Sequence, residues 1–293
     1  MFFFDFHSHL DWYKNDKQNS LLSSNSSALI NQRFYDSAYY AELLSQLEIF
    51  SGTIISASCN EESFYENLKI CEKAKALGIF YNTNNLPKII PTFGIHPKDV
   101  LKCSKNLHEY DKLCEQSKII GEIGMDFCWY KEADSEQQEK VLRFFLEHCH
   151  NQKKYCVIHT KDAEMQICNI LTEYPNAKPI IHWYDGPEKV YKEFIKRGYM
   201  QTFGCETIRS KHIQSLLLET PHNLILAETD NPTAETWLGG TNNSVFLIED
   251  IYQNIAKILN MHFEDCIEMI NNNSKRVLIE SGFNCFNCFN CFN

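Results

Sequence analysis

Short apolar runs recur along the chain, and enough residues for a helix separate each run from the next. The runs are nearly continuous instead of alternating apolar and polar residues, which is typical of parallel strands buried on both faces. The pattern predicts strands at 2–6, 53–58, 88–93, 118–123, 155–159, 178–182, 199–203 and 224–228.

Between the runs, apolar residues recur with the period of a helix. Ser135 and Gln138 have the spacing of a capping box, which predicts that a helix starts there. Two apolar stripes show the helical period: Val141, Leu142, Phe145, Leu146 and Cys149, and then Ala163, Ile167, Ile170 and Leu171. Alternating strands and helices predict the α/β class and a (β/α)8 TIM barrel. The alternative is an open doubly wound sheet, but no G-x-G-x-x-G turn follows any of the strands.

Two segments do not fit the barrel pattern. Residues 14–32 are rich in Asn and Ser and lie in the first strand-to-helix connection, which predicts either a loop insertion at the active-site rim or a plain surface loop. Residues 283–293 repeat Phe-Asn-Cys. The fourth cysteine and the proline of an iron–sulfur run are absent, which favours a low-complexity tail. We therefore predict one domain over 1–282, followed by this tail.

Composition limits where the protein works and what it binds. No apolar stretch approaches the roughly 18 residues of a spanning helix, and the N-terminus lacks the features of a signal peptide. Together with cysteines that show no pairing pattern, this predicts a cytoplasmic protein with reduced thiols and no membrane partner. The net charge of −10 disfavours a broad basic surface for duplex nucleic acid. It does not exclude a polyanionic substrate held through metal cations.

Side chains that bind metals follow the predicted strands. Active sites of such barrels lie at the carboxyl ends of the strands. His7 and His9 follow the first strand, and their spacing points both imidazoles the same way, as a chelating pair for a divalent metal requires. The complete set of strand-end ligands is His7, His9, Glu122, His159, His182 and Asp230.

This set exceeds the roughly three protein ligands of one open catalytic metal, so we predict two divalent cations. Glu122 follows the fourth strand, between the other two groups of ligands, and is the natural bridge. One cation would take His7, His9 and Asp230, and the other His159 and His182. Imidazole-rich ligation favours zinc or manganese over magnesium.

Other strand-end residues have less specific roles. His96, in "GIHP", is placed to orient a phosphate or to protonate a leaving oxygen, and the alternative is that it simply packs near the site. Glu228 is placed to brace a ligand histidine, and Asp126 to support the site or start a helix. Four loop aromatics either stack on an unpaired base or pack in the wall: Trp129, Tyr130, Trp183 and Tyr184. The remaining histidines are predicted to lie on the surface: His108, His148, His150, His212, His222 and His262.

The motifs "DFHSHL", "GIHP", "GEIGMDF", "IHTKDA", "IHWYDG" and "ETDNP" occur in this order. The series resembles that of the TatD-type metal-dependent hydrolases, deoxyribonuclease-like members of the amidohydrolase superfamily, from residue 5 to about 278. The resemblance implies the barrel, a binuclear site on the same ligands and hydrolysis of phosphodiester bonds, typically in DNA, with magnesium as a further possible metal. Lys161 stands where the family often has Arg, and it offers a point charge in place of a planar fork.

The predicted activity is metal-dependent hydrolysis of DNA. A water activated by the two cations would attack the phosphate, with Asp230 as general base and Glu122 bridging the metals. Lys161 and His96 would hold the substrate phosphate. An acidic monomer with one small charged cleft suits single-stranded DNA or DNA ends. The alternatives are hydrolysis of an amide, ester or lactone, and a metal-binding scaffold without turnover.

Overall fold

The computed structural model describes residues 1–13, 40–103, 105–232 and 244–283. All eight predicted strands are present, and every pairing between them is parallel. They are β1 (Phe3–Ser8), β2 (Gly52–Ser56), β3 (Ile89–Pro91), β4 (Ile119–Asp126), β5 (Tyr155–Lys161), β6 (Lys178–Ile181), β7 (Met200–Phe203) and β8 (Ile225–Ala227).

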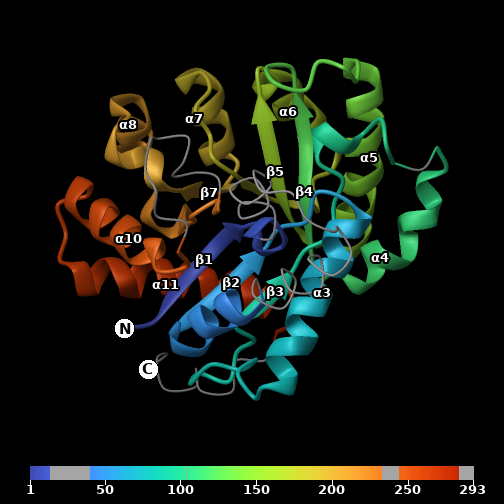
Figure 1. Cartoon of the computed structure of the whole chain (residues 1–293). Helices are drawn as coiled ribbons and strands as arrows, with labels where there is room; N and C mark the ends of the chain where they lie inside the picture. The colour runs from blue at the N-terminus through green and yellow to red at the C-terminus, as the bar shows by residue number, and fades with distance from the viewer. Residues whose placement is uncertain (14–39, 104, 233–243, 284–293) are drawn as a thin grey trace, which may run out of the picture.

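The strands form two continuous runs, β1–β2–β3 and β4 to β8, which backbone hydrogen bonds join at both edges. The amide of Gly121 in β4 donates to the carbonyl of Phe93, just after β3, at 2.9 Å. At the other edge, the amide of Asp230, just after β8, donates to the carbonyl of His7 in β1 at 2.8 Å. The sheet therefore closes on itself, and the predicted (β/α)8 barrel is confirmed (Figure 1).

Helices surround the strands (Figure 1). They are α3 (Glu61–Ala76), α4 (Asp111–Gln116), α5 (Ser135–Gln152), α6 (Glu164–Ile170), α7 (Glu188–Lys196), α8 (Lys211–Glu219), α10 (Leu247–Ile258) and α11 (Phe263–Glu280). Short 3-10 turns are η1 (Leu10–Trp12), η2 (Pro97–Asp99), η3 (Leu107–Tyr110), η4 (Leu171–Glu173), η5 (Cys205–Ile208) and η6 (His222–Leu224). Residues 40–49 are also helical. Among the described helices, none is long and apolar enough to cross a membrane.

The predicted capping box of α5 is wrong by one residue. Asp134, and not Ser135, is the N-cap: its carboxylate accepts from the amide of Gln137, whose side chain accepts from the amide of Asp134. A carboxylate here also favours the positive end of the helix dipole. Gln138 instead turns inward, where its side chain accepts from the amide of Asp126 at 2.7 Å and donates to its carbonyl. Gln138 thus ties α5 to the end of β4.

The apolar core has two layers. One lies between the strands and the helices and contains the buried stripes of α5 and α6. The other receives residues from all eight strands and therefore fills the barrel interior; it consists of Phe4, Phe6, Ile55, Leu86, Ile90, Ile119, Tyr155, Val157, Ile180, Met200, Leu224, Leu226, Val277 and Leu278.

Helix α11 closes the amino end of the barrel. The side-chain amide of Asn271 donates to the carbonyl of Phe2 at 2.8 Å, and that of Asn273 donates to the carbonyl of Ile225 at 2.8 Å. Both carbonyls belong to the starts of strands that lie side by side, β1 and β8. With this end covered, the carboxyl ends of the strands form the accessible end.

The predicted 14–32 insertion lies wholly outside the described residues. The predicted tail lies outside them beyond residue 283. Phe283 itself packs partly buried against the interior cluster, with the Lys118 ammonium 4.1 Å from its ring centre. The cysteines from Cys59 to Cys266 are all unpaired, and most are buried.

Candidate metal centre

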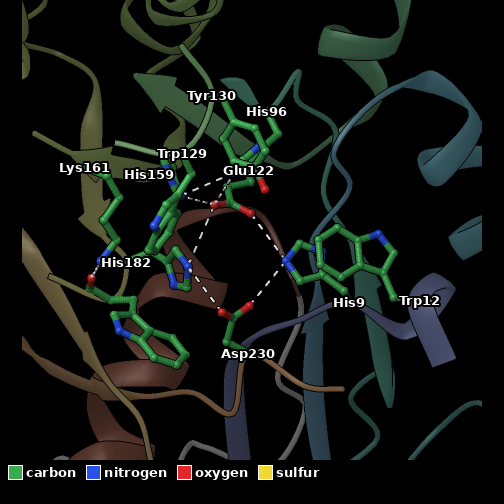
Figure 2. Close-up of a pocket in the computed structure, with 11 residues that line it drawn as sticks. His9, Trp12, His96, Glu122, Trp129, Tyr130, His159, Lys161, His182 and Asp230 are labelled. Atoms are coloured by element: carbon green, nitrogen blue, oxygen red, sulfur yellow. Dashed lines mark hydrogen bonds and ion pairs between the residues drawn. The ribbon is translucent and has the colours of Figure 1, made fainter. Parts of the chain in front are cut away.

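A pocket opens at the carboxyl end of the barrel (Figure 2). Its lining residues are His9, Trp12, His96, Glu122, Trp129, Tyr130, His159, Lys161, His182, Trp183 and Asp230. His7 lies fully buried in the same cluster, with Nε2 3.2 Å from Oε2 of Glu122. The barrel therefore brings all six predicted ligands together.

Irregularities in two strands aim two of these side chains. Between Asp5 and Ser8, three steps of β1 oppose two of β2, and between Ile120 and Ile123 three steps of β4 oppose two of β5. In β1, Phe6 points into the barrel interior, so plain alternation of side chains would turn His7 away from it. In β4, Ile119 points into the interior, so plain alternation would likewise turn Glu122 away. One extra residue in a strand re-aims the side chains around it. The bulges therefore direct His7 and Glu122 into the ligand cluster.

The atoms of the first group are spaced as ligands of one metal. The Nε2 atoms of His7 and His9 lie 3.2 Å apart, and 3.2 and 3.4 Å from Oε2 of Glu122. The same two nitrogens lie 3.6 and 3.3 Å from Oδ1 of Asp230. Tetrahedral ligands at about 2.1 Å from a metal lie about 3.4 Å from one another. The residues therefore fit a divalent cation between them.

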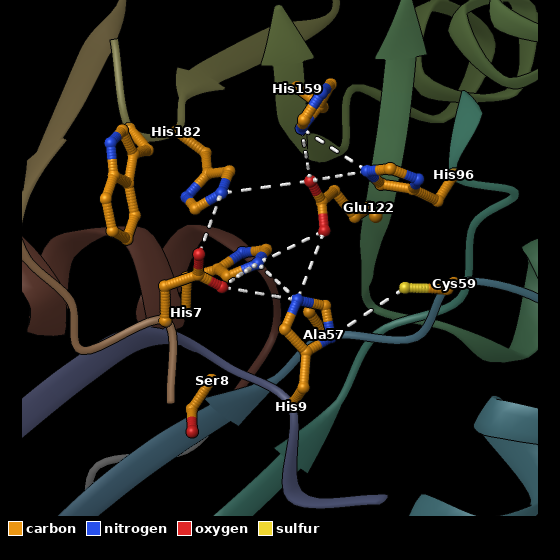
Figure 3. A network of polar contacts seen from close by, with 12 residues as sticks. His7, Ser8, His9, Ala57, Cys59, His96, Glu122, His159 and His182 are labelled. Carbon is orange, nitrogen blue, oxygen red and sulfur yellow. Dashed lines mark hydrogen bonds and ion pairs between the residues drawn. The ribbon is translucent and has the colours of Figure 1, made fainter. Parts of the chain in front are cut away.

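Glu122 also faces a second group of imidazoles through its other oxygen (Figure 3). Its Oε1 lies 2.9 Å from Nδ1 of His159, 3.5 Å from Nε2 of His96 and 3.8 Å from Nε2 of His182. Burial alone would raise the pKa of Glu122, but the surrounding histidines, foremost His96 and His7, hold it well below its usual range. Glu122 is therefore an anion between two sets of nitrogen ligands.

Carboxylates outside the centre fix the orientation of two histidines. Nε2 of His159 lies 2.9 Å from Asp126, and Nδ1 of His182 lies 2.7 Å from Glu228. A ring N–H that donates to a carboxylate leaves the lone pair of the other nitrogen directed at the centre, and metal-binding histidines are usually held in this way. Burial lowers the pKa of His159, but its hydrogen bonds with Asp126 and Glu122 raise it above the usual value.

His96 is close to the second group but differs in its protonation. Its Nδ1 accepts a hydrogen bond from the backbone amide of Lys98 at 3.1 Å. Burial holds the pKa of His96 well below its usual range, so the ring is neutral and its proton sits on Nε2. A protonated nitrogen cannot ligate a metal. His96 therefore directs an N–H donor at Glu122 and the pocket, and it does not join His159 as a ligand.

Asp230 combines a pocket position with a stable negative charge. Its backbone is left-handed, with φ 51°, and its side chain is 18% exposed, more than those of the other predicted ligands. Burial would raise the pKa of Asp230, but the hydrogen bond from His9 and the charges of His182 and His7 lower it. An ionised carboxylate at the pocket wall can accept a proton from a water molecule.

Lys161 lies in the pocket wall and is already paired. Its ammonium donates to Oδ1 of Asp185 at 2.7 Å and to the carbonyl of Trp183 at 3.0 Å, and lies 5.4 Å from the ring centre of Trp129. Tyr184 does not reach the pocket: its ring is buried and its hydroxyl donates to the carbonyl of Pro187. Of the four predicted aromatics, three line the pocket: Trp129, Tyr130 and Trp183.

Sequence reasoning missed three residues around His9. The ring of Trp12 stacks on that of His9, with centroids 4.1 Å apart and planes at 10°, and the ammonium of Lys98 lies 3.6 Å from the Trp12 ring centre. Sγ of Cys59 lies 3.8 Å from Nδ1 of His9. Cys59 follows β2 as the ligands follow their strands, so its position was a usable signal. Trp12 and Lys98 lie in short 3-10 turns, which no periodicity predicts.

The fold and the cluster together define an α/β barrel of the metal-dependent hydrolase class. Residues 4–279 match the family model described as TatD related DNase. Because this match covers nearly the whole chain, the protein belongs to the TatD-related DNase family.

Similar proteins agree with this assignment. The chain is 27% identical over 198 residues to an uncharacterized metal-dependent hydrolase, YabD, of Bacillus subtilis, covering 64% of this chain and 77% of the other. It is 26% identical over 206 residues to the Deoxyribonuclease TATDN3 of Homo sapiens, covering 64% and 74%. A TatD family hydrolase of Entamoeba histolytica superimposes with a TM-score of 0.71 at 19% identity, covering 94% and 97%. A TatD homologue of Escherichia coli gives 0.69 at 18% identity over the same shares, so both structures share the fold.

Proposed function

We propose that this protein hydrolyses phosphodiester bonds of DNA at a centre of two divalent cations bridged by Glu122. The observation that carries the proposal is the position of this carboxylate. Oε2 of Glu122 faces the nitrogens of His7 and His9, and Oε1 faces those of His159 and His182. Asp230 completes the first set. Zinc, manganese and magnesium are the metals to test, and the imidazole-rich ligand set favours zinc and manganese.

The residues divide the chemistry among them. When bound, the cations supply a water of lowered pKa and polarise a phosphoryl oxygen. Asp230 is ionised and accepts the proton of the attacking water. His96 donates its Nε2 hydrogen to the substrate phosphate; being neutral, it acts as a hydrogen-bond donor and not as an acid. Glu122 remains ionised and holds the two sets of ligands in register.

DNA is the proposed substrate for reasons of charge and shape. Lys161 and His96 give the pocket two donors for a phosphate, and Trp129 and Trp183 give it aromatic walls for an unpaired base. The net charge of −10 opposes a wide grip on duplex DNA, so single strands or ends suit this pocket. The name of the human relative, a deoxyribonuclease, points the same way.

The proposal extends to the setting of the enzyme. All of the proposed ligands come from one chain, so a monomer suffices. The unpaired cysteines support a reducing, cytoplasmic location.

A substrate panel tests the proposal. Single-stranded DNA, single-stranded RNA, a phosphodiester dye and a lactone are incubated with the protein, with added Mn²⁺ and with chelator. We expect metal-dependent cleavage of DNA that the chelator abolishes. Hydrolysis of the lactone alone would contradict the proposal and would show that the enzyme attacks a carbonyl carbon and not a phosphodiester. The absence of turnover on every substrate, with metal bound, would identify a scaffold without activity.

Metal stoichiometry tests the bridge. Equilibrium dialysis with Mn²⁺ should give two equivalents per chain for the wild type. Glu122→Gln keeps the shape but removes the charge, so it should weaken both equivalents and abolish turnover, whereas His182→Ala should chiefly remove one. A wild-type plateau at one equivalent would contradict the bridged centre. Turnover of Glu122→Gln within tenfold of wild type would exclude bridging as the basis of catalysis.

A further inference from the structure

The proposed ligand histidines are held in two different ways. His159 and His182 each direct the outer ring nitrogen at a carboxylate, at 2.9 Å from Asp126 and 2.7 Å from Glu228. Such a bond fixes the ring about its Cβ–Cγ axis and makes the inner nitrogen a stronger ligand. Both histidines of the proposed second site are therefore oriented by hydrogen bonds with carboxyl groups.

The histidines of the proposed first site lack this support. Nδ1 of His7 is buried and has no hydrogen-bond partner among the described residues, and Nδ1 of His9 lies 3.8 Å from the thiol of Cys59. A thiol is a weak hydrogen-bonding group. Ring faces restrain these imidazoles instead: His7 stacks on His182 with centroids 3.8 Å apart and planes at 16°.

His9 is restrained by a residue from outside the ligand set. Trp12 lies nearly parallel to it, at 10° and 4.1 Å, and is itself covered on its other side by Lys98, whose ammonium is 3.6 Å from the indole centre. The Lys98 side chain extends from η2, directly after His96, and Trp12 belongs to η1, directly after His9. Two short turns at the ends of β1 and β3 thus clamp the indole against the imidazole.

We propose that Trp12 is a positioning residue for the first metal site, where its ring, backed by Lys98, holds His9 in the orientation that binds the cation. This inference rests on the proposed two-metal function. Stacking restrains the ring plane of His9 but does not accept a hydrogen bond from its Nδ1, so it fixes the direction of the ring without raising the basicity of the ligand nitrogen. The two sites therefore differ in affinity, and changes at Trp12 act on one of them.

A Mn²⁺ titration of the full chain tests the role of Trp12. Calorimetry compares wild type, Trp12→Leu and Trp12→Phe, each also in a His159→Ala background that isolates the first site. We expect Trp12→Leu to lower the affinity for Mn²⁺ at the first site about tenfold and to leave the affinity of the second site unchanged. A tenfold loss is the lower end of the range for groups that orient a ligand histidine. Trp12→Phe keeps an aromatic face and should recover most of the affinity. Lys98→Met should lower the affinity of the first site for Mn²⁺ roughly two- to fivefold, as expected for loss of a cation–π contact.

Trp129→Leu is the matched control, because this tryptophan lines the same pocket but its ring is tilted by 56° from His159 at a centroid distance of 6.4 Å. It should bind Mn²⁺ as the wild type does. Equal affinity of wild type and Trp12→Leu at the first site would overturn the inference, as would equal losses at both sites or no recovery in Trp12→Phe. Failure of the wild type to bind two equivalents would instead refute the proposed function.

Discussion

Asp230 and His96 face the pocket from opposite sides, and their surroundings give them opposite proton roles (Figure 2). Asp230 lies among imidazoles that, against the effect of burial, keep its pKa below the usual value, so it is a proton acceptor at neutral pH. His96 accepts from the Lys98 amide through Nδ1, which leaves a hydrogen on Nε2 for donation. The difference follows from single contacts and predicts different effects of mutation.

Asp230→Asn should separate metal binding from turnover. The amide keeps one weak oxygen ligand but cannot accept a proton, so turnover should fall by about two to four orders of magnitude, the range for a positioned general base. Bound Mn²⁺ should largely persist. Turnover and metal content are measured on the same sample. Near wild-type turnover with full metal would mean that another group takes the proton.

His96→Gln and His159→Gln distinguish a donor from a ligand. The glutamine amide at position 96 can still donate a hydrogen bond, so this variant should retain both equivalents of Mn²⁺. Its donor is displaced, and a hydrogen bond weakened by roughly 1.4 kcal/mol should lower turnover about tenfold. His159→Gln should lose one equivalent. Dialysis with Mn²⁺ reads both results, and loss of an equivalent in His96→Gln would make His96 a ligand.

At the scale of elements, the barrel is built differently at its two ends. Bulges in β1 and β4 re-aim side chains at the carboxyl end, where the pocket lies. At the amino end, α11 supplies side-chain amides to backbone carbonyls near the start of β8: Asn273 donates to His222 at 2.7 Å and to Ile225 at 2.8 Å. Stability and function are therefore separable along the barrel axis.

Asn273→Ala tests this separation. It removes two hydrogen bonds from a buried site and should lower the free energy of unfolding by about 2 kcal/mol, the cost of leaving buried polar groups unpaired. Asn272 is its exposed neighbour on the same helix, and Asn272→Ala should stay within about 0.5 kcal/mol of wild type. Urea unfolding measures both, and folded Asn273→Ala should keep its Mn²⁺ stoichiometry. Equal stability of the two variants would refute the role of the α11 amides.

At the scale of the molecule, buried carboxyl groups lie close to the ligand cluster: Asp5 accepts from the amide of His7, and Glu228 lies 2.7 Å from Nδ1 of His182. Burial is the main cause of the raised pKa of Asp5, to about 7, and of Glu206 and Glu228, each to about 8. Cations bound close to these carboxyls would favour their ionised forms, because cations are the strongest local charges in such sites. Cations are therefore expected to stabilise the whole fold.

Metal removal should lower the melting temperature. A ligand at about 100 times its dissociation constant stabilises a fold by roughly 2.7 kcal/mol, which corresponds to about 4 to 5 °C for a chain of this size. Calorimetry of chelator-treated protein, with and without restored Mn²⁺, measures the shift. The variant Glu122→Gln should show little shift, because it lacks the bridge. An identical melting temperature with and without metal in the wild type would contradict a preformed centre.

The sequence by itself determined the strands and the set of residues at their ends. Apolar runs and their spacing are local properties, and every parallel strand of a barrel ends on the same side, so His159 and Asp230 could be assigned to one end without knowing any distance. The stripe of α5 was equally local. The N-cap of α5 was not determined by local sequence, because Asp134 and Ser135 both suit an N-cap and only the packing of Gln138 against β4 selects between them.

Only the tertiary structure decided how these side chains are aimed and protonated. The bulges that turn His7 and Glu122 inward depend on pairing with the neighbouring strands, which no single run encodes. The proton on Nε2 of His96 depends on one backbone amide, and the support of His9 by Trp12 depends on two turns meeting in space. Composition and periodicity are sums over local sequence, whereas orientation and protonation depend on contacts between segments that are distant along the chain.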